Sequence, residues 1–388
     1  MLRTKSITLG NYTAYLPVLL FLLWLLMQAG VYYAHGVRIV FDSHRYLDEA
    51  DKLLSTGDLA QLRISYLSYS AILALCIAVF GNAKAVVLVQ IIVGGLSTVA
   101  FYRLALVLLQ GRLLAYFATG LLLLWPLYQH WHFYIHTESL FASLSIVAFY
   151  RVVSANKLWH YIQLLLLLII LTFLRANGFM VPLAVLAYAA TAYWLRQGHS
   201  LRLLLLMVAI GGLGFTVALA HFFLGDMAGI HSFTGHLVSG NIIQGYNKIS
   251  FVPQQELVLS GSPLAQVGQL VWQEPAFFMK KSLGRIFYYW SQMRPYISFR
   301  YKVAIVVFLY PLYVLAAIGL WKQQLPKPFI LAIAVLSGLF TAMVVVSGVD
   351  WDNRFMMPLL PYLYLSAAAG LKTFGVWHDD AWELNSQK

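Results

Sequence analysis

The chain has 388 residues, of which 61% are hydrophobic and 10% are charged. Soluble domains average about 25% charged residues, so this composition excludes an ordinary soluble protein. The formal net charge is +12, but no basic tract accompanies it, and nucleic-acid binding is not expected. Cys76 is the one cysteine, which excludes an intramolecular disulfide and a metal site built from cysteines.

Apolar runs of about 20 residues recur from end to end, and each is long enough to cross the hydrocarbon core of a bilayer as a helix. The runs are continuous and rich in leucine rather than alternating, which favours helices over a β-barrel. We therefore predict an all-α polytopic membrane protein with about ten transmembrane helices. The expected spans are residues 15–33, 85–109, 113–128, 140–153, 161–174, 179–195, 203–223, 303–321, 329–347 and 355–374.

The segment 66–80 is apolar but shorter than a comfortable span, and we predict that it lies at the interface or re-enters the membrane. If it does not cross and the N-terminus is cytoplasmic, the basic residues of nearly every short loop fall on the cytoplasmic side, as the positive-inside rule expects. These residues are Arg103, Arg112, Arg151, Lys157, Arg196, Arg202, Lys322, Lys327 and Lys372. The first apolar run is then an uncleaved signal anchor, and both termini are cytoplasmic.

This charge bias sends five polar stretches to the outer face, where they hold most of the carboxylates. They are residues 34–83, 129–139, 175–178, 225–302 and 348–354. The predicted parts are an N-terminal transmembrane module (1–223) with its first external loop (34–83), an external loop domain (224–302), and C-terminal transmembrane helices with a short cytoplasmic tail (303–388). The loop domain is expected to be ordered, because glycine and proline turn signals divide it.

Acidic residues are concentrated in "VRIVFDSHRYLDEADKLLSTGDL", residues 37–59. Five of the 14 in the chain lie there: Asp42, Asp48, Glu49, Asp51 and Asp58. Apolar residues recur at helical spacing from 43 to 56, and Gly57 follows, so an amphipathic helix on the outer membrane surface is expected. Asp42 either caps this helix or carries chemistry. The other four are expected to be solvated, with Asp48 paired to Lys52.

The second polar stretch, "HWHFYIHTESL", places His130, His132, His136, Thr137 and Glu138 at a membrane edge. Three histidines and a glutamate allow a zinc site, but the H-E-x-x-H pattern is missing. Thr137 and Glu138 also suit the first turn of a helix, where a hydroxyl or a carboxylate is favourable. Both interpretations stay open from the sequence.

Single arginines stand beside apolar runs on the outer side: Arg175 in "FLRANGF", Arg294 in "SQMRPYIS" and Arg354 in "DWDNRFMMPLLP". Near a membrane edge each can extend its charge into water at little cost. The positive-inside bias makes outer arginines less expected, however, and a guanidinium matches phosphate with two parallel hydrogen bonds. Carboxylates and arginines would then meet on one membrane face, as a reaction at an interfacial phosphate requires.

These segments, in their order along the chain, resemble the GT-C superfamily of glycosyltransferases that use polyprenyl-phosphate sugars. This group includes protein O-mannosyltransferases and lipid A aminoarabinose transferases. The resemblance is carried by "FDSHRYLDEA", "HTESLF", "LRANGF" and "RFMMPLLPYLYLSAAAGL" and covers about residues 21–371. It implies a GT-C-like fold with interfacial helices in the first external loop and one larger external loop.

The resemblance also implies roles for individual residues. Asp42 matches the acidic general base of the first external loop, and Glu138 matches an acidic position that organises the site. Arg175 and Arg354 match basic positions near the lipid-phosphate pocket. We also predict that His44, Arg45, His136, Arg294 and Tyr296 bind substrate. Ser43 stands where many members have a second acidic residue, so no metal ligand is assigned and dependence on a divalent cation is left open.

The implied reaction moves a sugar from a polyprenyl-phosphate donor to an acceptor hydroxyl of a glycan, lipid or protein, with inversion. Because the chain is compact with short cytoplasmic loops, we expect a bacterial inner membrane with the site facing the periplasm and membrane lipid as a further partner, although an endoplasmic-reticulum membrane would follow the same logic. Aromatic residues of the outer loops could stack on sugar rings or belong to the interface belt. These aromatic candidates are Tyr46, Trp131, Tyr246, Trp272, Tyr288, Tyr289 and Trp290.

Two other functions remain open. A transporter or flippase of lipid-linked sugar is expected to show two related halves, and none are evident in the sequence. An oligosaccharide ligase or polymerase would depend on basic residues of the large loop, such as His231, His236 and Arg294. Alanine at Asp42 separates these classes, because only the glycosyltransferase hypothesis gives Asp42 an essential proton transfer.

Overall fold

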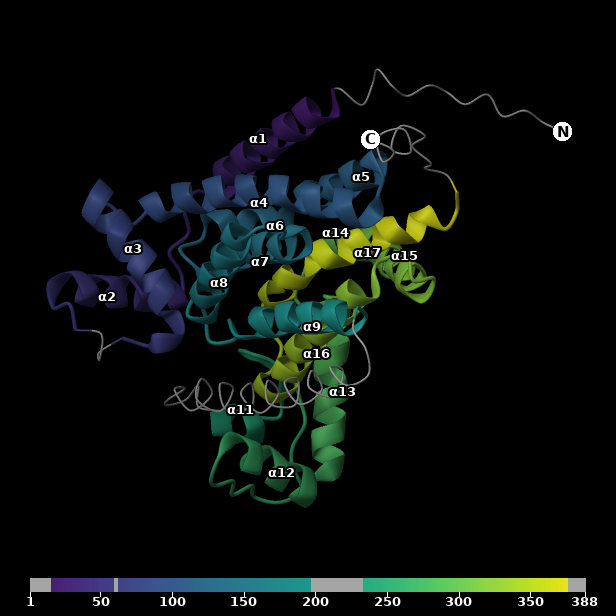
Figure 1. Cartoon of the computed structure of the whole chain (residues 1–388). Helices are drawn as coiled ribbons and strands as arrows, with labels where there is room; N and C mark the ends of the chain where they lie inside the picture. The colour runs from purple at the N-terminus through teal and green to yellow at the C-terminus, as the bar shows by residue number, and fades with distance from the viewer. Residues whose placement is uncertain (1–14, 59–61, 197–232, 376–388) are drawn as a thin grey trace.

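The computed structural model describes residues 15–58, 62–196 and 233–375 (Figure 1). The regular structure in this part of the chain is helical, apart from one antiparallel hairpin formed by β1 (Asn241–Ile243) and β2 (Tyr246–Ser250). The predicted span 203–223 and His231 lie outside the described residues.

Four helices in the described ranges are long and apolar enough to cross a membrane. They are α1 (Leu16–His35), α4 (Ala85–Leu109), the continuous helix Phe299–Trp321 and α16 (Lys327–Ser347). Each coincides with a predicted span, and the chain is an all-α membrane protein. The number of ten spans stays a prediction.

The continuous helix consists of α14 (Phe299–Ala304), the π-helical turn η6 (Ile305–Leu309) and α15 (Tyr310–Trp321). Shorter apolar helices occur earlier in the chain. Three of them are α5 (Arg112–Leu124), α8 (Leu158–Thr172) and α9 (Met180–Trp194). At 1.5 Å per residue these three helices reach only about 20 Å, so flanking residues are needed to complete a crossing of about 30 Å.

The centre of the bundle is α7 (Thr137–Ser154), which packs against α4, α8 and α9. Its buried face is rich in small residues, among them Ala142, Ser143 and Ala148. Small side chains let neighbouring helices approach closely, which is how membrane helices gain packing energy without a hydrophobic driving force. The carboxylate of Glu138 lies in the first turn of this central helix.

A second close contact joins α15 to α17 (Leu360–Lys372). A side chain at Gly319 would collide with backbone of Ser366 and Gly370, and one at Gly370 would collide with the carbonyl of Leu315. The helix α17 continues from the 3₁₀ turn η7 (Arg354–Leu359), so this contact fixes the element that carries Arg354.

The loop between α1 and α4 contains α2 (Asp42–Ser55), the turn η3 (Ile64–Tyr66) and α3 (Leu67–Phe80). The predicted helix over 43–56 is confirmed, and Gly57 follows it with φ +65°, as a C′ glycine should. Asp48 and Lys52 form the predicted pair, with Oδ2 and Nζ 2.8 Å apart. The apolar stripe differs in one respect: Tyr46 and Ala50 are buried and α2 packs on α3, so protein covers this part of the stripe.

Glu49 corrects the expectation of a solvated acidic face. Its side chain is only 4% exposed, and its Oε2 accepts a hydrogen bond of 2.8 Å from the Ser70 hydroxyl on α3. Burial raises the pKa of Glu49, although this hydrogen bond opposes the shift. The buried edge of the helix is therefore wider than the apolar stripe alone indicates.

Two backbone contacts attach this loop to the segment before α7, which contains α6 (Pro126–His130) and η4 (Trp131–Phe133). The N–H of Arg38 donates to the carbonyl of Phe133 at 2.8 Å, and the N–H of Ile135 donates to the carbonyl of Arg38 at 3.1 Å. The start of α2 is thereby held beside the start of α7.

Residues 233–291 form a small helical unit on the side of the bundle opposite α1 (Figure 1). It contains α11 (Phe233–Val238), the hairpin, α12 (Pro263–Gln273) and α13 (Pro275–Ser291). The hairpin register pairs Asn241 with Ser250 and Ile243 with Tyr246. The unit has its own apolar cluster, made of Phe233, Leu237, Leu270 and Phe277.

Candidate active site

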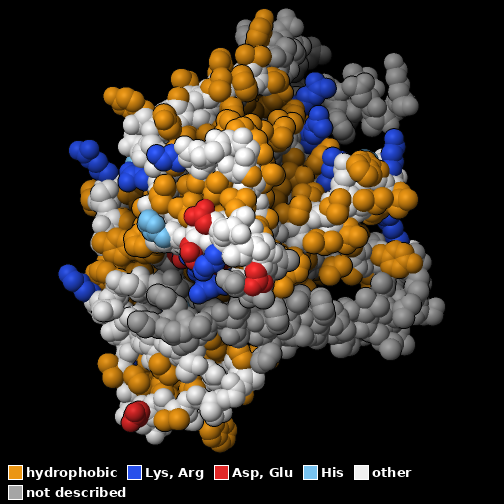
Figure 2. All heavy atoms as spheres, turned by 90° about the vertical axis from the view of Figure 1, so that its left-hand side faces the viewer, with side chains coloured by type: hydrophobic (Ala, Val, Ile, Leu, Met, Phe, Trp, Pro, Cys, Tyr) orange, Lys and Arg blue, Asp and Glu red, His pale blue; other side chains and the backbone are white. Residues whose placement is uncertain are grey.

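Acidic and basic side chains gather in the middle of one face of the molecule, bordered by hydrophobic side chains (Figure 2). Ion pairs bring together four residues from distant parts of the chain: Asp42 at the start of α2, Glu138 in the first turn of α7, Arg175 between α8 and α9, and Arg354 at the start of η7. We call these four residues the charged cluster. All four were predicted from the sequence to take part in the site.

Arg354 is the centre of the charged cluster. Its Nη1 lies 3.0 Å from Oδ2 of Asp42 and 3.6 Å from Oε1 of Glu138. Arg175 reaches the same Glu138 oxygen with its Nη2 at 3.4 Å. One guanidinium therefore bridges two carboxylates, and a second guanidinium shares one of them.

Asp42 is the first residue of α2, and no side chain caps this helix at its N-cap residue, Phe41. The alternative that Asp42 merely caps the helix is therefore wrong, because its carboxylate faces Arg354. Arg45, one turn along α2, lies 3.7 Å from the other carboxylate oxygen. Burial would raise the pKa of Asp42, but the charges of Arg354 and Arg45 outweigh burial and hold that pKa below its ordinary value. Asp42 is thus ionised at neutral pH and able to accept a proton.

Glu138 is only 2% exposed, so its charge depends on its partners. Besides the two arginines, His136 places Nδ1 3.5 Å from Oε2 of Glu138. The other ring nitrogen of His136 lies 2.9 Å from the carbonyl of Val40, two residues before Asp42. His136 therefore connects the two acidic segments, and Glu138 serves both as a first-turn carboxylate of α7 and as an ion-pair partner.

The zinc alternative for the histidine segment has no support in the geometry. His132 places Nδ1 2.6 Å from the Ser139 hydroxyl, while His136 faces Glu138 and Val40. Within the described ranges no three His, Cys, Asp or Glu residues converge as metal ligands would.

Nη1 of Arg175, Nε of Arg354 and Nδ2 of Asn177 are buried donors that lack a hydrogen-bond partner among the described residues. A buried donor without a partner costs about 1–3 kcal/mol, so native proteins seldom leave one without a reason. Two of the three belong to the arginines that pair with Glu138. Asn177 was not predicted, although its position two residues after Arg175 in "LRANGF" is a signal that could have identified it.

Hydrogen bonds of the turn "DWDNR" fix the backbone position of Arg354. The N–H of Arg354 donates to Oδ2 of Asp350 at 2.6 Å. Asn353 adopts the left-handed conformation, with φ 65°, which asparagine tolerates better than most residues. Its side-chain amide donates to the carbonyl of Gln292 at 3.0 Å. The two acidic residues of this turn were not predicted as part of the site, although both lie within four residues of Arg354.

Arg294 lies in this supporting layer and is only 1% exposed. Its Nε donates to the backbone carbonyl of Asp350 at 3.1 Å, and its Nη2 lies 3.7 Å from Oδ1 of the same residue. Burial, and then the charge of Asp350, raise the pKa of Asp352 well above its ordinary value. Arg294 is therefore paired with Asp350 rather than with the charged cluster.

The two other predicted binding residues lie at the edge of the charged cluster. His44 is exposed on α2. The Tyr296 hydroxyl donates to the backbone carbonyl of Trp351, and the Tyr296 ring remains partly exposed. Of the aromatic candidates, Tyr46, Trp131 and Tyr289 are buried, so none of these three can offer a ring face to a sugar.

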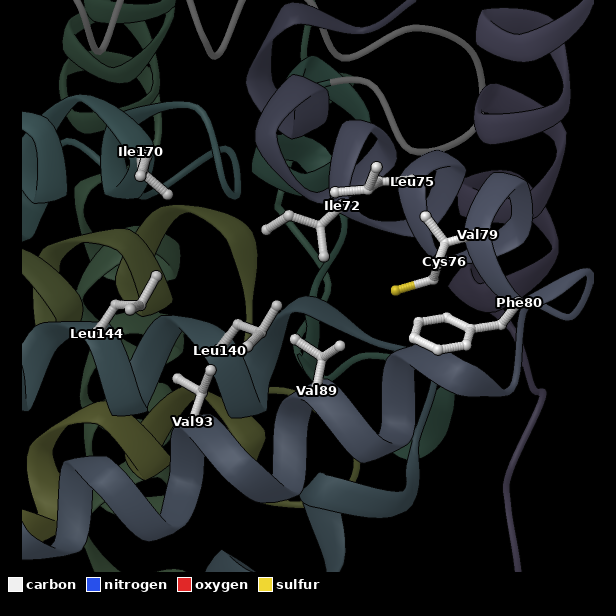
Figure 3. A pocket seen from close by; sticks show the side chains of 10 residues that line it. All are labelled: Ile72, Leu75, Cys76, Val79, Phe80, Val89, Val93, Leu140, Leu144 and Ile170. Atoms are coloured by element: carbon white, nitrogen blue, oxygen red, sulfur yellow. The ribbon is translucent and has the colours of Figure 1, made fainter.

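An apolar hollow of about 400 Å³ opens between α3, α4, α7 and α8 (Figure 3). Its lining contains no charged side chain, and the side chains come from all four helices. The lining residues are Ile72, Leu75, Cys76, Val79, Phe80, Val89, Val93, Leu140, Leu144 and Ile170. Leu140 follows Glu138 by two residues on α7, so the hollow and the charged cluster share one helix.

Comparison with known proteins does not assign the chain. No protein-family model matches it, and no curated protein matches it significantly.

Proposed function

We propose that this protein is a membrane glycosyltransferase with a GT-C-like arrangement. It transfers a sugar from a polyprenyl-phosphate donor to an acceptor hydroxyl, with inversion, at the non-cytoplasmic face of a bacterial inner membrane. The observation that carries the proposal is the contact of an ionised carboxylate, Asp42, with Arg354, which shares Glu138 with Arg175. Both of these arginines retain a buried donor without a partner among the described residues. The apolar hollow beside α7 gives a lipid-linked substrate a place for its chain.

Charge balance favours a phosphodiester as the bound group. Three arginines, Arg45, Arg175 and Arg354, surround two carboxylates, Asp42 and Glu138, which leaves one net positive charge. A sugar linked through phosphate to a polyprenyl chain carries one negative charge, so it neutralises the site. The planar guanidinium also suits phosphate, because two of its N–H groups can donate in parallel.

The same balance holds as the bond to the sugar breaks. The acceptor oxygen forms a bond to the anomeric carbon, and its proton passes to Asp42. The bond between that carbon and the phosphate oxygen breaks, and its electron pair stays on the phosphate, which becomes doubly charged. Because Asp42 has become neutral, the site then carries two positive charges against two negative charges. A general base contributes typically 10²–10⁴-fold to such a step.

Arg354 has two tasks in this scheme. Before the donor binds, it keeps Asp42 ionised; as the phosphate acquires charge, it stabilises the leaving group as a preorganised electrostatic partner. A single displacement at carbon inverts its configuration. Phosphate leaves without protonation, so one carboxylate is sufficient, unlike glycoside hydrolysis, where two are required.

The ligase and transporter alternatives have less support in the geometry. A ligase would use Arg294, but the guanidinium of Arg294 is buried against Asp350, behind Arg354. A transporter needs no proton acceptor beside a phosphate site, whereas Asp42 and Arg354 are in direct contact.

The test of the proposal is sugar transfer by the full chain in lipid nanodiscs. Synthetic polyprenyl-phosphate sugars would serve as donors, and glycosides, serine peptides and lipid alcohols as acceptors, with and without a chelator. The expected result is release of polyprenyl phosphate coupled to an acceptor product of inverted configuration. Movement of intact donor across the bilayer without cleavage would overturn the proposal in favour of transport, and loss of activity with chelator would add a metal to the mechanism.

A further inference from the structure

The residue before Asp42 has a backbone conformation that needs an explanation. Phe41 has φ 47° and ψ −112°, outside the regions that L residues with large side chains normally occupy. Such strain costs of the order of 1–3 kcal/mol and persists where the surrounding structure requires it. Burial does not offset this cost, because the Phe41 side chain is 69% exposed.

The exposed ring of Phe41 faces a second aromatic ring on the other side of the charged cluster. Its centroid lies 5.2 Å from that of Trp351, and the ring planes are inclined by 54°. Phe41 precedes Asp42, and Trp351 precedes Arg354 by three residues. The contact between Phe41 and Trp351 therefore runs alongside the ion pair between Asp42 and Arg354.

Further aromatic side chains extend this surface. The Trp351 carbonyl accepts a hydrogen bond from the Tyr296 hydroxyl, which ties the tryptophan backbone to the loop after α13. The Tyr296 ring lies 5.3 Å from the ring of Tyr246 on β2. The result is a set of aromatic rings beside a carboxylate and a guanidinium, contributed by the first loop, the hairpin and the "DWDNR" turn.

A pyranose ring matches both parts of this surface. One face of such a ring presents C–H groups that pack on aromatic faces, and its edge carries hydroxyls that donate to carboxylates. A hydrocarbon chain would match the rings but not the charged groups, and the apolar hollow between α3, α4, α7 and α8 already offers it a better surface.

We infer that Phe41 and Trp351 form the binding subsite for the sugar ring of a carbohydrate acceptor, whose hydroxyl is thereby held at Asp42. This inference rests on the proposed function and names its acceptor class: a glycan, rather than a peptide or a lipid alcohol. The strained conformation of Phe41 has a direct role, because it directs the ring outward while the next residue turns inward to Arg354.

The conformation of Phe41 also allows a clean test. Glycine populates positive φ without steric cost, so Phe41→Gly removes the ring while the turn at the start of α2 remains favourable. Phe41→Tyr keeps the ring. Trp351→Leu removes the second ring but preserves the backbone carbonyl that Tyr296 uses. Trp321→Leu is the matched control, because Trp321 is an 85% exposed tryptophan at the end of α15, outside the site.

The measurements are acceptor and donor kinetics and saturation-transfer NMR with methyl pyranosides and short glycans, using the full chain in nanodiscs. Phe41→Gly and Trp351→Leu should each raise the acceptor KM about tenfold, which corresponds to about 1.4 kcal/mol, with kcat and the donor KM little changed. Trp321→Leu should behave as wild type, Phe41→Tyr should restore most of the acceptor affinity that Phe41→Gly loses, and Phe41→Gly should melt no lower than wild type.

The outcomes separate this inference from the proposed function. Transfer by wild type with an unchanged acceptor KM in Phe41→Gly would overturn the subsite and leave the glycosyltransferase proposal standing. Transfer only to peptides or lipid alcohols would likewise overturn it. If wild type transfers no sugar but binds pyranosides, and both ring variants lose that binding, the carbohydrate subsite stands and the proposed reaction fails.

Discussion

Arg354 and Arg285 are both held inside the protein, but they are held in different ways. Arg285 on α13 directs its donors to backbone carbonyls, including Val345 and Val346 in the last turn of α16 and Asn241 on β1. Cations are favourable at a helix C-terminus, where carbonyls lack partners. Arg354 instead contacts two carboxylates and keeps a buried Nε without a partner among the described residues.

The difference teaches how to separate a structural arginine from a functional one when both are buried. The hydrogen bonds of Arg285 attach the small helical unit of residues 233–291 to the bundle. Their acceptors are backbone carbonyls, so no titratable side chain accepts them. The contacts of Arg354 are to groups whose charge can change, and part of its donor capacity is unused. We therefore expect Arg285 to govern stability and Arg354 to govern activity and its pH dependence.

The largest expected effect concerns the partner of Arg354. Asp42→Asn should lower kcat about 10²–10⁴-fold, because the amide cannot accept the acceptor proton. Donor affinity should be retained or increased, since Arg354 loses a competing negative charge. Transfer rates and equilibrium binding of a non-hydrolysable donor analogue check both statements. Transfer at the wild-type rate would show that Asp42 is not the general base. It would favour the alternative hypothesis of a ligase that uses basic residues of the large loop.

The next prediction tests whether the positive charge of Arg354 or the shape of its guanidinium sets the pH dependence of activity. Arg354→Gln should lower kcat about 10²-fold through lost stabilisation of the leaving phosphate. Because Arg354 lowers the pKa of Asp42, the variant should also titrate Asp42 at higher pH. The active form is deprotonated, so the acidic limb of the kcat/KM profile should move toward higher pH. Arg354→Lys retains the charge and should leave that limb near its wild-type position; equal shifts in both variants would contradict the electrostatic explanation.

A substitution at Arg285 should have the opposite result: it should lower stability and leave the pH dependence of activity unchanged. Arg285→Met removes the donors to α16 and should lower the free energy of unfolding by about 3 kcal/mol, as expected for hydrogen bonds from a charged group. Below its lowered melting temperature the variant should retain the wild-type pH profile. Thermal melts in detergent together with transfer rates at low temperature check the prediction. A changed pH profile would show that the two arginines are not separable.

The smallest effect is expected at the exposed pair of α2. Asp48 and Lys52 lie 2.8 Å apart, closer than the contacts of the charged cluster, but their side chains are 62% and 42% exposed. Exposed pairs contribute about 0–1 kcal/mol because water and salt screen them. Asp48→Asn should therefore change stability by less than about 0.5 kcal/mol and leave transfer unchanged. A large loss in either measurement would mean that distance, rather than burial, decides which pairs matter.

The sequence predicted the parts of the structure that depend on local periodicity. Apolar run length located four helices that are able to span the membrane, and the spacing of apolar residues located α2 and its C′ glycine within a residue or two. Residue chemistry and charge bias indicated Arg175 and Arg354, and the resemblance to the GT-C superfamily assigned roles to Asp42 and Glu138.

What the sequence could not decide were contacts between distant segments. Whether Asp42 caps a helix or forms an ion pair depends on Arg354, which follows it by 312 residues. Glu49 is buried only because Ser70 on α3 offers it a hydroxyl. The aromatic pair was missed because an aromatic residue in a loop gives no local signal of φ or of its partner. These outcomes depend on tertiary packing between distant segments, which the local spacing of residues in the sequence does not reveal.

The glycine contact between α15 and α17 has a consequence for how the site opens. Because separation of α15 and α17 would lose the close backbone packing at Gly319 and Gly370, we expect the arginine at the start of η7 to belong to the less mobile wall of the site. Admission of a bulky ligand must then displace the opposite wall, at the start of α2. Distance labels placed across α2 and α16 would register that displacement, and a compound that wedges α2 outward would block turnover without competing for the phosphate.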